Sequence, residues 1–248
     1  MKTILLAAGV GERLGQYSGN KPKCLLEFDG ISLLRRHLAI LTHYGIDSIT
    51  IVTGYRSDLI EQEFAASPAA RRIITIKNDD YKKGSIISML KGVATLDSDE
   101  DFLLMDADVL YDHRIIERLL RSDHPDCFLL DKDFVPGDEP VKLCVRDGQL
   151  VEFRKKIADN LEYDYQGESV GFFRFTKATA DKLVKSAKSY LGRGEENQPY
   201  EECIRDLLLA SPDQFGFEDI TGLKWLEIDF PEDIERAKKE ILPVILQV

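Results

Sequence analysis

MKTILLAAGVGERLGQYSGNKPKCLLEFDG, residues 1–30, leads from a short apolar strand into a loop of small residues and then into two groups of cations. The predicted strand ends at Leu6, and four small residues follow it: Ala7, Ala8, Gly9 and Gly11. Main chain without bulky side chains at a strand end lets a ligand approach the backbone N–H groups closely. Arg13, Lys21 and Lys23 then supply fixed positive charge that suits a polyphosphate. The stretch therefore predicts a site for a nucleoside triphosphate.

This loop differs from two common nucleotide-binding loops. No Gly-Lys-Ser/Thr follows the glycines, as a P-loop requires. Leu14 stands where the dinucleotide-binding fingerprint has its third glycine or alanine. Gly9 and Gly11 alone also fit an ordinary strand-to-helix turn. The prediction therefore depends on the whole string and not on the glycines.

Composition excludes several classes of protein. The chain has 248 residues, 44% of them apolar, which allows one large domain or two small ones. A net charge of −11 argues against non-specific nucleic-acid binding. No run of about 18 apolar residues and no signal-peptide pattern is present, so we expect no membrane insertion. The cysteines are widely spaced, which predicts reduced thiols in a cytoplasmic protein: Cys24, Cys127, Cys144 and Cys203.

Strand and helix patterns alternate along the first half of the chain. The expected strands cover residues 48–53, 72–77 and 101–105, and the expected helices cover 31–44, 58–66 and 85–95. Such alternation predicts an α/β fold, with a Rossmann-like, mainly parallel mixed sheet that has helices on both faces. Ligands of such sheets bind beyond the carboxyl ends of the strands, so loop 7–13 and segment 106–108 can face one crevice.

The second half has a different pattern. Segments 141–146 and 149–154 around Asp147-Gly148 predict a β-hairpin. Further elements follow: a strand over 169–175, helices over 177–191 and 200–210, a strand over 224–229 and a helix from Pro231. We expect a single domain over 1–248, with a nucleotide-binding half at about 1–135, an acceptor-binding half at about 136–248 and the hairpin as an inserted lid.

Two acidic pairs follow predicted strands. Asp106 and Asp108 share a side if the chain is extended, and so do Glu227 and Asp229. Close carboxylates repel each other unless a cation lies between them, and Mg²⁺ binds one or two carboxylates together with substrate phosphates. The alternatives are an ordinary acidic loop start for the first pair, and for Asp229 a cap on the helix that begins at Pro231.

The string Leu-x-Ala-Ala-Gly-x-Gly-x-Arg, followed by Lys-Pro-Lys and an apolar run that ends at Asp29-Gly30, resembles the signature of the nucleotidyltransferases that make sugar nucleotides and CDP-alcohols. The resemblance continues in order through 84–88, 106–108, 171–173 and 227–233. It implies a GT-A-like nucleotidyltransferase fold. It also implies a catalytic Mg²⁺ on Asp108 and Asp229, with Asp106 and Glu227 as helpers.

The reaction implied is attack by an acceptor phosphate or phosphonate oxygen on the α-phosphorus of the triphosphate, with pyrophosphate leaving. The acceptor oxygen is already ionised near neutral pH, so catalysis requires alignment and charge neutralisation and no general base. Arg13 would bind the β- and γ-phosphates, and Lys23 would bridge the α-phosphate and the incoming oxygen. Lys21 is the alternative catalytic lysine, but the family pattern favours the lysine after the proline.

The resemblance is nearest to small cytidylyltransferases that act on phosphocholine, aminoethylphosphonate or inositol phosphate, which favours CTP. The predicted nucleotide-binding residues are Leu6, Ala7, Ala8, Gly9, Gly11, Asn78, Gly84, Ser85 and Asp106. A cationic acceptor head would need carboxylates or aromatic rings, and its anionic end would need cations. The predicted acceptor-binding residues are Asp133, Lys142, Lys156, Glu168, Gly171, Tyr200 and Glu201, with Asp131, Arg154, Lys155, Tyr163, Tyr165 and Phe173 as further candidates.

Other functions remain open from the sequence. A sugar-1-phosphate or polyol-phosphate nucleotidyltransferase using UTP, dTTP or CTP is the main alternative. A nucleotide-binding subunit without catalysis and a glycosyltransferase are the others, and a glycosyltransferase has no need of the Lys-Pro-Lys segment. The expected partners are small molecules and not nucleic acids, and the expected assembly is a monomer or homodimer.

Overall fold

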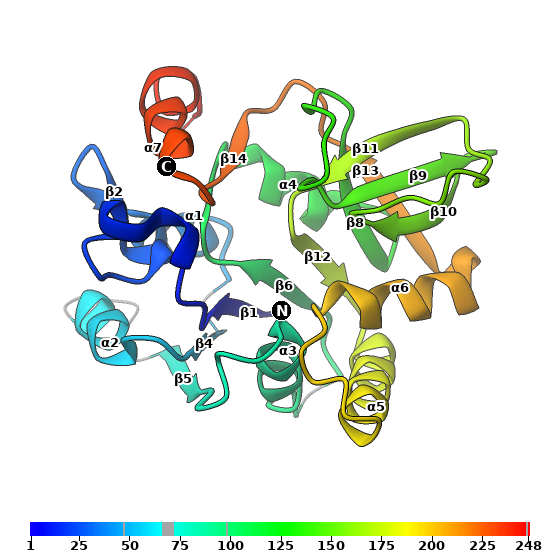
Figure 1. Ribbon diagram of the computed structural model, residues 1–248, viewed down its shortest axis with the longest axis horizontal. Helices are drawn as coiled ribbons and strands as arrows, with labels where there is room; N and C mark the ends of the chain where they lie inside the picture. The colour runs from blue at the N-terminus through cyan, green and yellow to red at the C-terminus, as the bar shows by residue number, and fades with distance from the viewer. Residues whose placement is uncertain (47, 66–71, 98, 247) are drawn as a thin grey trace.

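One mixed β-sheet runs through both halves of the chain (Figure 1). The computed structural model describes residues 1–46, 48–65, 72–97, 99–246 and 248. Ten of the described strands form this sheet in the order β10-β9-β11-β8-β12-β6-β1-β4-β5, with β13 paired to β8. In the described part of the chain, no helix is both long and apolar enough to cross a bilayer.

The first half supplies the parallel part of the sheet. β1 pairs in parallel with β4 and β6, and β4 pairs in parallel with β5. The elements of this half are β1 Lys2–Ala7, β2 Glu27–Phe28, β3 Ile31–Ser32, α1 Leu33–His43, β4 Ser48–Thr53, α2 Ser57–Ala65, β5 Ile73–Lys77, α3 Ser85–Val93, β6 Phe102–Asp106, β7 Val109–Tyr111, α4 Arg114–Arg121 and β8 Asp126–Asp131. The α/β prediction for this half is confirmed.

The second half extends the same sheet with antiparallel strands. β12 pairs with β6, β11 joins β8 to β9, and β9 pairs with β10. The elements are β9 Lys142–Arg146, β10 Gln149–Arg154, β11 Tyr165–Ser169, β12 Phe172–Phe175, α5 Lys177–Gly192, α6 Glu201–Ala210, β13 Phe215–Asp219, β14 Trp225–Glu227 and α7 Pro231–Arg236. β14 lies outside the large sheet and pairs with β7.

Alternation along the strands divides the core between the two faces of the sheet. Leu5 packs with α1, α2 and α4 on one face, whereas Ile4 packs with α3, α5 and α6 on the other. Successive side chains of a strand point to opposite faces, so a strand buried on both faces is apolar throughout. A third cluster joins Leu14 and Phe28 to Ile228 and to the helical turn Ala237–Ile241 that follows α7. It attaches the C-terminal segment to the first loop.

Local signals explain two predicted boundaries. α1 begins at Leu33 and not at Ile31, because the Ser32 side chain accepts a hydrogen bond from the Arg35 N–H at 3.1 Å and caps the helix. Asp147 and Gly148 both have positive φ, at 52° and 78°, which is the type I′ geometry that an Asp-Gly hairpin favours. The predicted hairpin is therefore confirmed as β9 and β10.

Other boundaries differ from the sequence analysis. The strand expected over 169–175 is two strands, β11 and β12, separated by a turn at Gly171. β7, α4, β8 and β13 were not predicted. The hairpin is continuous with the main sheet through β11, and not an insertion that stands apart from it. The expected helix over 58–66 is α2, but its last residue, Ala66, lies outside the described residues.

Close packing of α3 on the sheet yields a test of the fold. A Cβ on Gly92 would lie 2.6 Å from Ile4 Cγ2 and 2.9 Å from Val52 Cγ2. Gly92→Ala should therefore lower stability by about 1–3 kcal/mol through overpacking, although alanine favours helices by about 1 kcal/mol. A thermal melt should show a midpoint lower by about 2–10 °C. Gly192→Ala is the control, since nothing lies within 4 Å of a Cβ there. Equal melting temperatures for the two variants would contradict this packing.

Candidate active site

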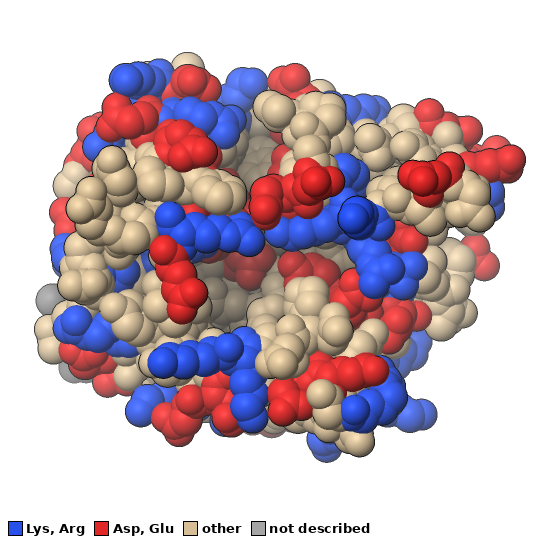
Figure 2. All heavy atoms as spheres, viewed as in Figure 1, with Lys and Arg blue, Asp and Glu red and all other residues tan. Residues whose placement is uncertain are grey.

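The carboxyl ends of β1 and β6 open onto a cavity of about 490 Å³. Figure 2 shows a hollow in this face, crossed by Lys and Arg side chains and with Asp and Glu side chains deeper inside. Residues from both halves of the chain line the cavity: Leu6, Ala7, Gly9, Gly11, Glu12, Arg13, Lys23, Cys24, Ser85, Ala107, Asp108, Lys155 and Asp229. The expected crevice beyond these strand ends is therefore present.

The β7–β14 pair brings two distant aspartates to one wall of the cavity. Glu227 pairs with Val109 in this antiparallel ladder, and the Ile228 N–H donates to the Asp108 carbonyl at 3.0 Å. The Asp233 carboxylate then accepts hydrogen bonds from the backbone N–H groups of Asp229 and Phe230, at 3.0 and 2.8 Å. Asp233 therefore holds the start of α7, and the carboxylate of Asp229 faces the cavity. The alternative that Asp229 only caps this helix is wrong.

Lys23 lies between these two aspartates. Its Nζ is 2.9 Å from Asp108 Oδ2 and also forms an ion pair with Asp229. The three side chains are only 17–21% exposed, so solvent screens the pairs less than on an open surface. Burial alone would lower the pKa of Lys23, but the charges of Asp108 and Asp229 outweigh burial and raise the pKa. Lys23 therefore stays cationic.

Gly11 allows the first loop to lie against Lys23. A Cβ at position 11 would be 2.8 Å from Lys23 Cγ, and Gly11 has a φ of 70° that favours glycine. The loop backbone and the lysine stem therefore form one continuous wall.

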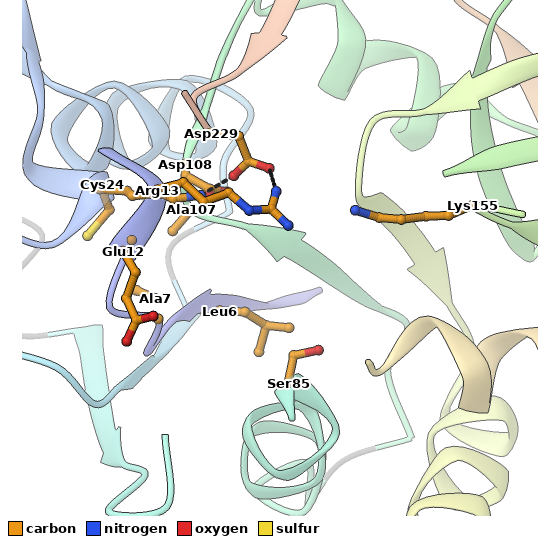
Figure 3. A pocket seen from close by; sticks show the side chains of 13 residues that line it. Leu6, Ala7, Glu12, Arg13, Cys24, Ser85, Ala107, Asp108, Lys155 and Asp229 are labelled. Carbon is orange, nitrogen blue, oxygen red and sulfur yellow. Dashed lines mark hydrogen bonds and ion pairs between the residues drawn. The ribbon is translucent and has the colours of Figure 1, made fainter. Parts of the chain in front are cut away.

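Arg13 and Lys155 face the cavity from different halves of the chain (Figure 3). Arg13 Nη1 lies 3.0 Å from Asp229 Oδ2, and its guanidinium stacks over the Phe230 ring at 5.2 Å. Lys155 follows β10 and extends towards Arg13 from the opposite side in Figure 3, while Leu6 and Ser85 lie on the wall between them. The two cations therefore face each other across the cavity.

Three carboxylates could hold a divalent cation. One oxygen from each of Asp108, Glu227 and Asp229 lies within 4.8 Å of the others, which is the one such group of three found in the described residues. All the donors are oxygens, as Mg²⁺ prefers. Lys23 supplies the positive charge that offsets two of these carboxylates in the structure. The donor set therefore fits a magnesium ion.

Asp106 lies behind the cavity wall and contacts Tyr200, the residue before α6. The Tyr200 hydroxyl donates to Asp106 Oδ2 at 2.7 Å, and the Tyr200 N–H donates to Ser85 Oγ at 2.9 Å. Burial raises the pKa of Asp106 well above its usual range, and the charge of Asp108 adds to this effect. Gly171 lies against the same carboxylate, since a Cβ there would be 2.4 Å from Asp106 Oδ2. Asp106 therefore joins the first half of the chain to the second.

Gly84 lies against the connection between α5 and α6. Its N–H donates to the Glu196 carbonyl at 2.9 Å, and a Cβ would lie 2.1 Å from the Gln198 carbonyl oxygen. Only glycine permits this approach. Gly84 supports the wall that Ser85 lines.

Some predicted residues do not line the cavity. Asn78 is buried and its side chain bonds to Ser88 Oγ and the Asp80 N–H, at 3.0 and 3.1 Å, so the structure does not bring it to the nucleotide site. The Lys142 ammonium donates to three carbonyls and is not available to an acceptor anion. Asp133 is exposed and pairs with Lys224 at 3.4 Å. Four further predicted residues do not line it: Ala8, which is buried, Lys156, which is exposed, and Glu168 and Glu201, which are partly buried.

Four lining residues were absent from the predicted sets of site residues. Glu12, Cys24 and Ala107 adjoin predicted residues, and their positions beside Gly11, Lys23 and Asp108 are the signal that could have found them. Lys155 was only a further candidate, and the structure places Lys155, but not Lys156, on the cavity wall.

A family model for the MobA-like NTP transferase domain matches residues 3–178, well over half of the chain. The chain belongs to this family. As a MobA-like NTP transferase, the protein is a nucleotidyltransferase, and the predicted family and enzyme class are confirmed.

Two curated relatives and one solved structure are similar to this NTP transferase. A UTP–glucose-1-phosphate uridylyltransferase of Haloferax volcanii is 30% identical, over 97% of this chain and 96% of its own. A CMP-5'-(3-aminopropyl)phosphonate synthase of Streptomyces rubellomurinus is 24% identical over 98% of this chain, which spans only 39% of that longer protein. The inositol-1-phosphate CTP transferase of T. maritima has the same fold, with a TM-score of 0.75 at 22% identity, over 99% of this chain and 97% of that one.

Glu168 yields a pH test of the acceptor half. Burial and the charge of Asp131 raise the pKa of Glu168 from 4.5 to about 7. Between these pH values the folded state holds a proton that the unfolded state releases, so stability falls as pH rises through this window. Glu168→Gln removes this dependence. As the pH rises from 5 to 8, the free energy of unfolding of this variant should therefore increase by about 1–3 kcal/mol relative to that of the wild type. Urea unfolding at several pH values measures the difference.

The control for this test is Glu162→Gln, because Glu162 is exposed. Its stability curve should run parallel to that of the wild type. If the stability curve of Glu168→Gln also runs parallel to that of the wild type, Glu168 does not hold a proton in the folded state.

Proposed function

We propose that this protein is a Mg²⁺-dependent cytidylyltransferase that transfers CMP from CTP to a small acceptor phosphate or phosphonate and releases pyrophosphate. The observation that carries the proposal is Lys23 between Asp108 and Asp229, on the wall of a cavity that Arg13 and Lys155 also line. The CMP-phosphonate synthase and the CTP transferase among the similar proteins favour cytidine.

The proposed reaction forms one bond and breaks one. An ionised oxygen of the acceptor attacks the α-phosphorus, the bond between the α-phosphorus and the bridging oxygen breaks, and pyrophosphate leaves with that electron pair. No proton needs to move, so the residues contribute position and charge. Arg13 binds the leaving phosphates, Lys23 neutralises charge at the α-phosphate, and Lys155 binds the acceptor anion. The open backbone of Gly9 and Gly11 admits the triphosphate.

Asp108, Asp229 and Glu227 would hold the magnesium ion. When bound, this ion supplies positive charge to the phosphate oxygens and orients them for in-line attack. Lys23 contacts two of these three residues, so metal binding would free its ammonium to bind phosphate.

The acceptor we propose carries an amine at the end remote from its phosphate. The carboxyl groups of Asp106 and Glu201 lie near Tyr200, whose N–H donates to the cavity residue Ser85. Oε2 of Glu201 is buried and has no hydrogen-bond partner within the described part of the chain. An ammonium donor would satisfy this oxygen, and such satisfaction is usual for buried polar atoms. The primary ammonium of 2-aminoethylphosphonate can donate this hydrogen bond, whereas the quaternary ammonium of phosphocholine has no N–H and would supply only its positive charge.

A sugar-1-phosphate or polyol-phosphate nucleotidyltransferase is the second candidate. The uridylyltransferase of Haloferax volcanii is similar over nearly its whole length, and sugar hydroxyls can also donate to Glu201. The two candidates differ in the charge of the acceptor.

Pyrophosphate release measured with four nucleoside triphosphates and a panel of acceptors tests the proposal. We expect release with CTP only when phosphocholine or 2-aminoethylphosphonate is added, and its loss with a chelator of Mg²⁺. Inositol phosphate, glycerol phosphate and glucose 1-phosphate are the comparison acceptors. Pyrophosphate release with UTP and glucose 1-phosphate alone would favour the second candidate function. Release that does not require an acceptor would contradict both candidate functions.

The two lysines around Pro22 yield a matched test of the catalytic role. Lys23→Ala should lower turnover by about 10²–10³-fold and change nucleotide affinity far less, because its charge is needed where negative charge develops. Lys21 pairs with Glu27 at 3.5 Å and does not line the cavity, so Lys21→Ala should keep near-normal turnover. Steady-state kinetics and nucleotide titration of both variants separate these effects. A larger loss of turnover in Lys21→Ala than in Lys23→Ala would assign the catalytic role to Lys21.

A further inference from the structure

Glu139 connects the two cations that face the cavity. One of its oxygens, Oε2, lies 3.1 Å from Arg13 Nη1 and 3.1 Å from Lys155 Nζ. Arg13 comes from the first loop, Lys155 follows the hairpin, and Glu139 lies on the connection between β8 and β9, residues 132–141. A single carboxylate oxygen thus bridges the two halves of the chain at the cavity mouth.

Lys142 braces this connection against the hairpin. Its Nζ donates to the carbonyls of Gly137 at 2.7 Å, Pro140 at 3.3 Å and Lys155 at 2.6 Å. The segment that carries Glu139 and the backbone of Lys155 are therefore held together as one unit. The ion pair of Glu139 with Arg13 attaches this unit to the first loop.

The contacts of Glu139 are those that a phosphate would need. In the proposed function Arg13 binds the leaving phosphates and Lys155 binds the acceptor anion, and a carboxylate oxygen presents the same charge and the same acceptor atom to both. Arg13 Nη1 and Lys155 Nζ cannot turn fully to a substrate while they hold Glu139. Binding of a substrate anion and retention of Glu139 are therefore in competition.

We propose that Glu139 is a latch that holds Arg13 and Lys155 until a substrate phosphate displaces it. This inference rests on the proposed function, because that function assigns anions to the two cations. The side chains of Glu139, Arg13 and Lys155 are 52%, 49% and 47% exposed. Exposed ion pairs are weak and screened by salt, so a triphosphate with several charges displaces the carboxylate easily. The latch should weaken anion binding by about 2- to 10-fold.

Titration calorimetry of the full chain with inorganic tripolyphosphate tests the latch without a nucleotide or an acceptor. Glu139→Gln should bind tripolyphosphate about 2- to 10-fold more tightly than the wild type at low salt. Glu139→Asp keeps the charge but shortens the side chain, and it should also bind more tightly. The matched control is Asp138→Asn, which removes the same charge one residue earlier from an exposed side chain with no partner in the described structure. It should leave the affinity within about twofold of the wild type.

Three results would overturn the latch. An equal increase in tripolyphosphate affinity in Asp138→Asn and Glu139→Gln would mean that the net charge of the segment weakens anion binding, and not the contact of Glu139 with the two cations. Weaker binding in Glu139→Gln would mean that Glu139 prepares the two cations for the anion. No binding of tripolyphosphate by any of these proteins would mean that the cations do not form an anion site.

Hydrogen exchange provides a second readout. Amides of residues 132–141 should exchange faster in the wild type when tripolyphosphate is added, and should exchange fast in Glu139→Gln without it. Slower exchange in the wild type on addition would contradict displacement of the segment. These readouts do not depend on turnover. A failed acceptor panel together with tighter tripolyphosphate binding in Glu139→Gln would therefore reject the proposed function and keep the latch.

Discussion

The ammonium of Lys23 between Asp108 and Asp229 is the interaction on which the site depends. These residues come from three separate parts of the chain, and two like charges would not stay together on a partly buried wall without a cation. The β7–β14 ladder places the aspartates, and Gly11 gives the lysine stem its space. The segment at Lys23, the residues that follow β6 and the start of α7 are therefore positioned by one shared charge.

The division of the sheet explains why residues from both halves of the chain line the cavity. Parallel strands of the first half end at the loops that line the cavity, whereas antiparallel strands of the second half extend the sheet to the hairpin and to Lys155. β12 lies beside β6, so Gly171 and Asp106 are adjacent across the junction of the halves. Continuous hydrogen bonding across that junction joins the two halves of the chain in one sheet.

The sequence predicts the first half well because its strands are short apolar runs between amphipathic helices, as at β4 and α1. It fails at β8, because the four apolar residues of Asp126–Asp131 lie between two buried aspartates, and aspartate is depleted in strands. Site residues that depend on a motif, such as Lys23 and Asp108, could be predicted. Lys142 and Asn78 could not be excluded, because their side chains bond to backbone or side-chain partners that only the folded loops bring near.

The contact of Gly84 with the carbonyls of residues 196–198 has a consequence for how specificity can change. The segment between α5 and α6 leads directly into Tyr200, which reaches both Ser85 and Asp106. The cavity wall at Ser85 and the contact of Tyr200 with Asp106 are thus parts of one interlocked joint. Exchanging this segment to obtain a different acceptor would also move the start of α3. A redesigned enzyme would need compensating substitutions on both sides of the joint to retain its nucleotide.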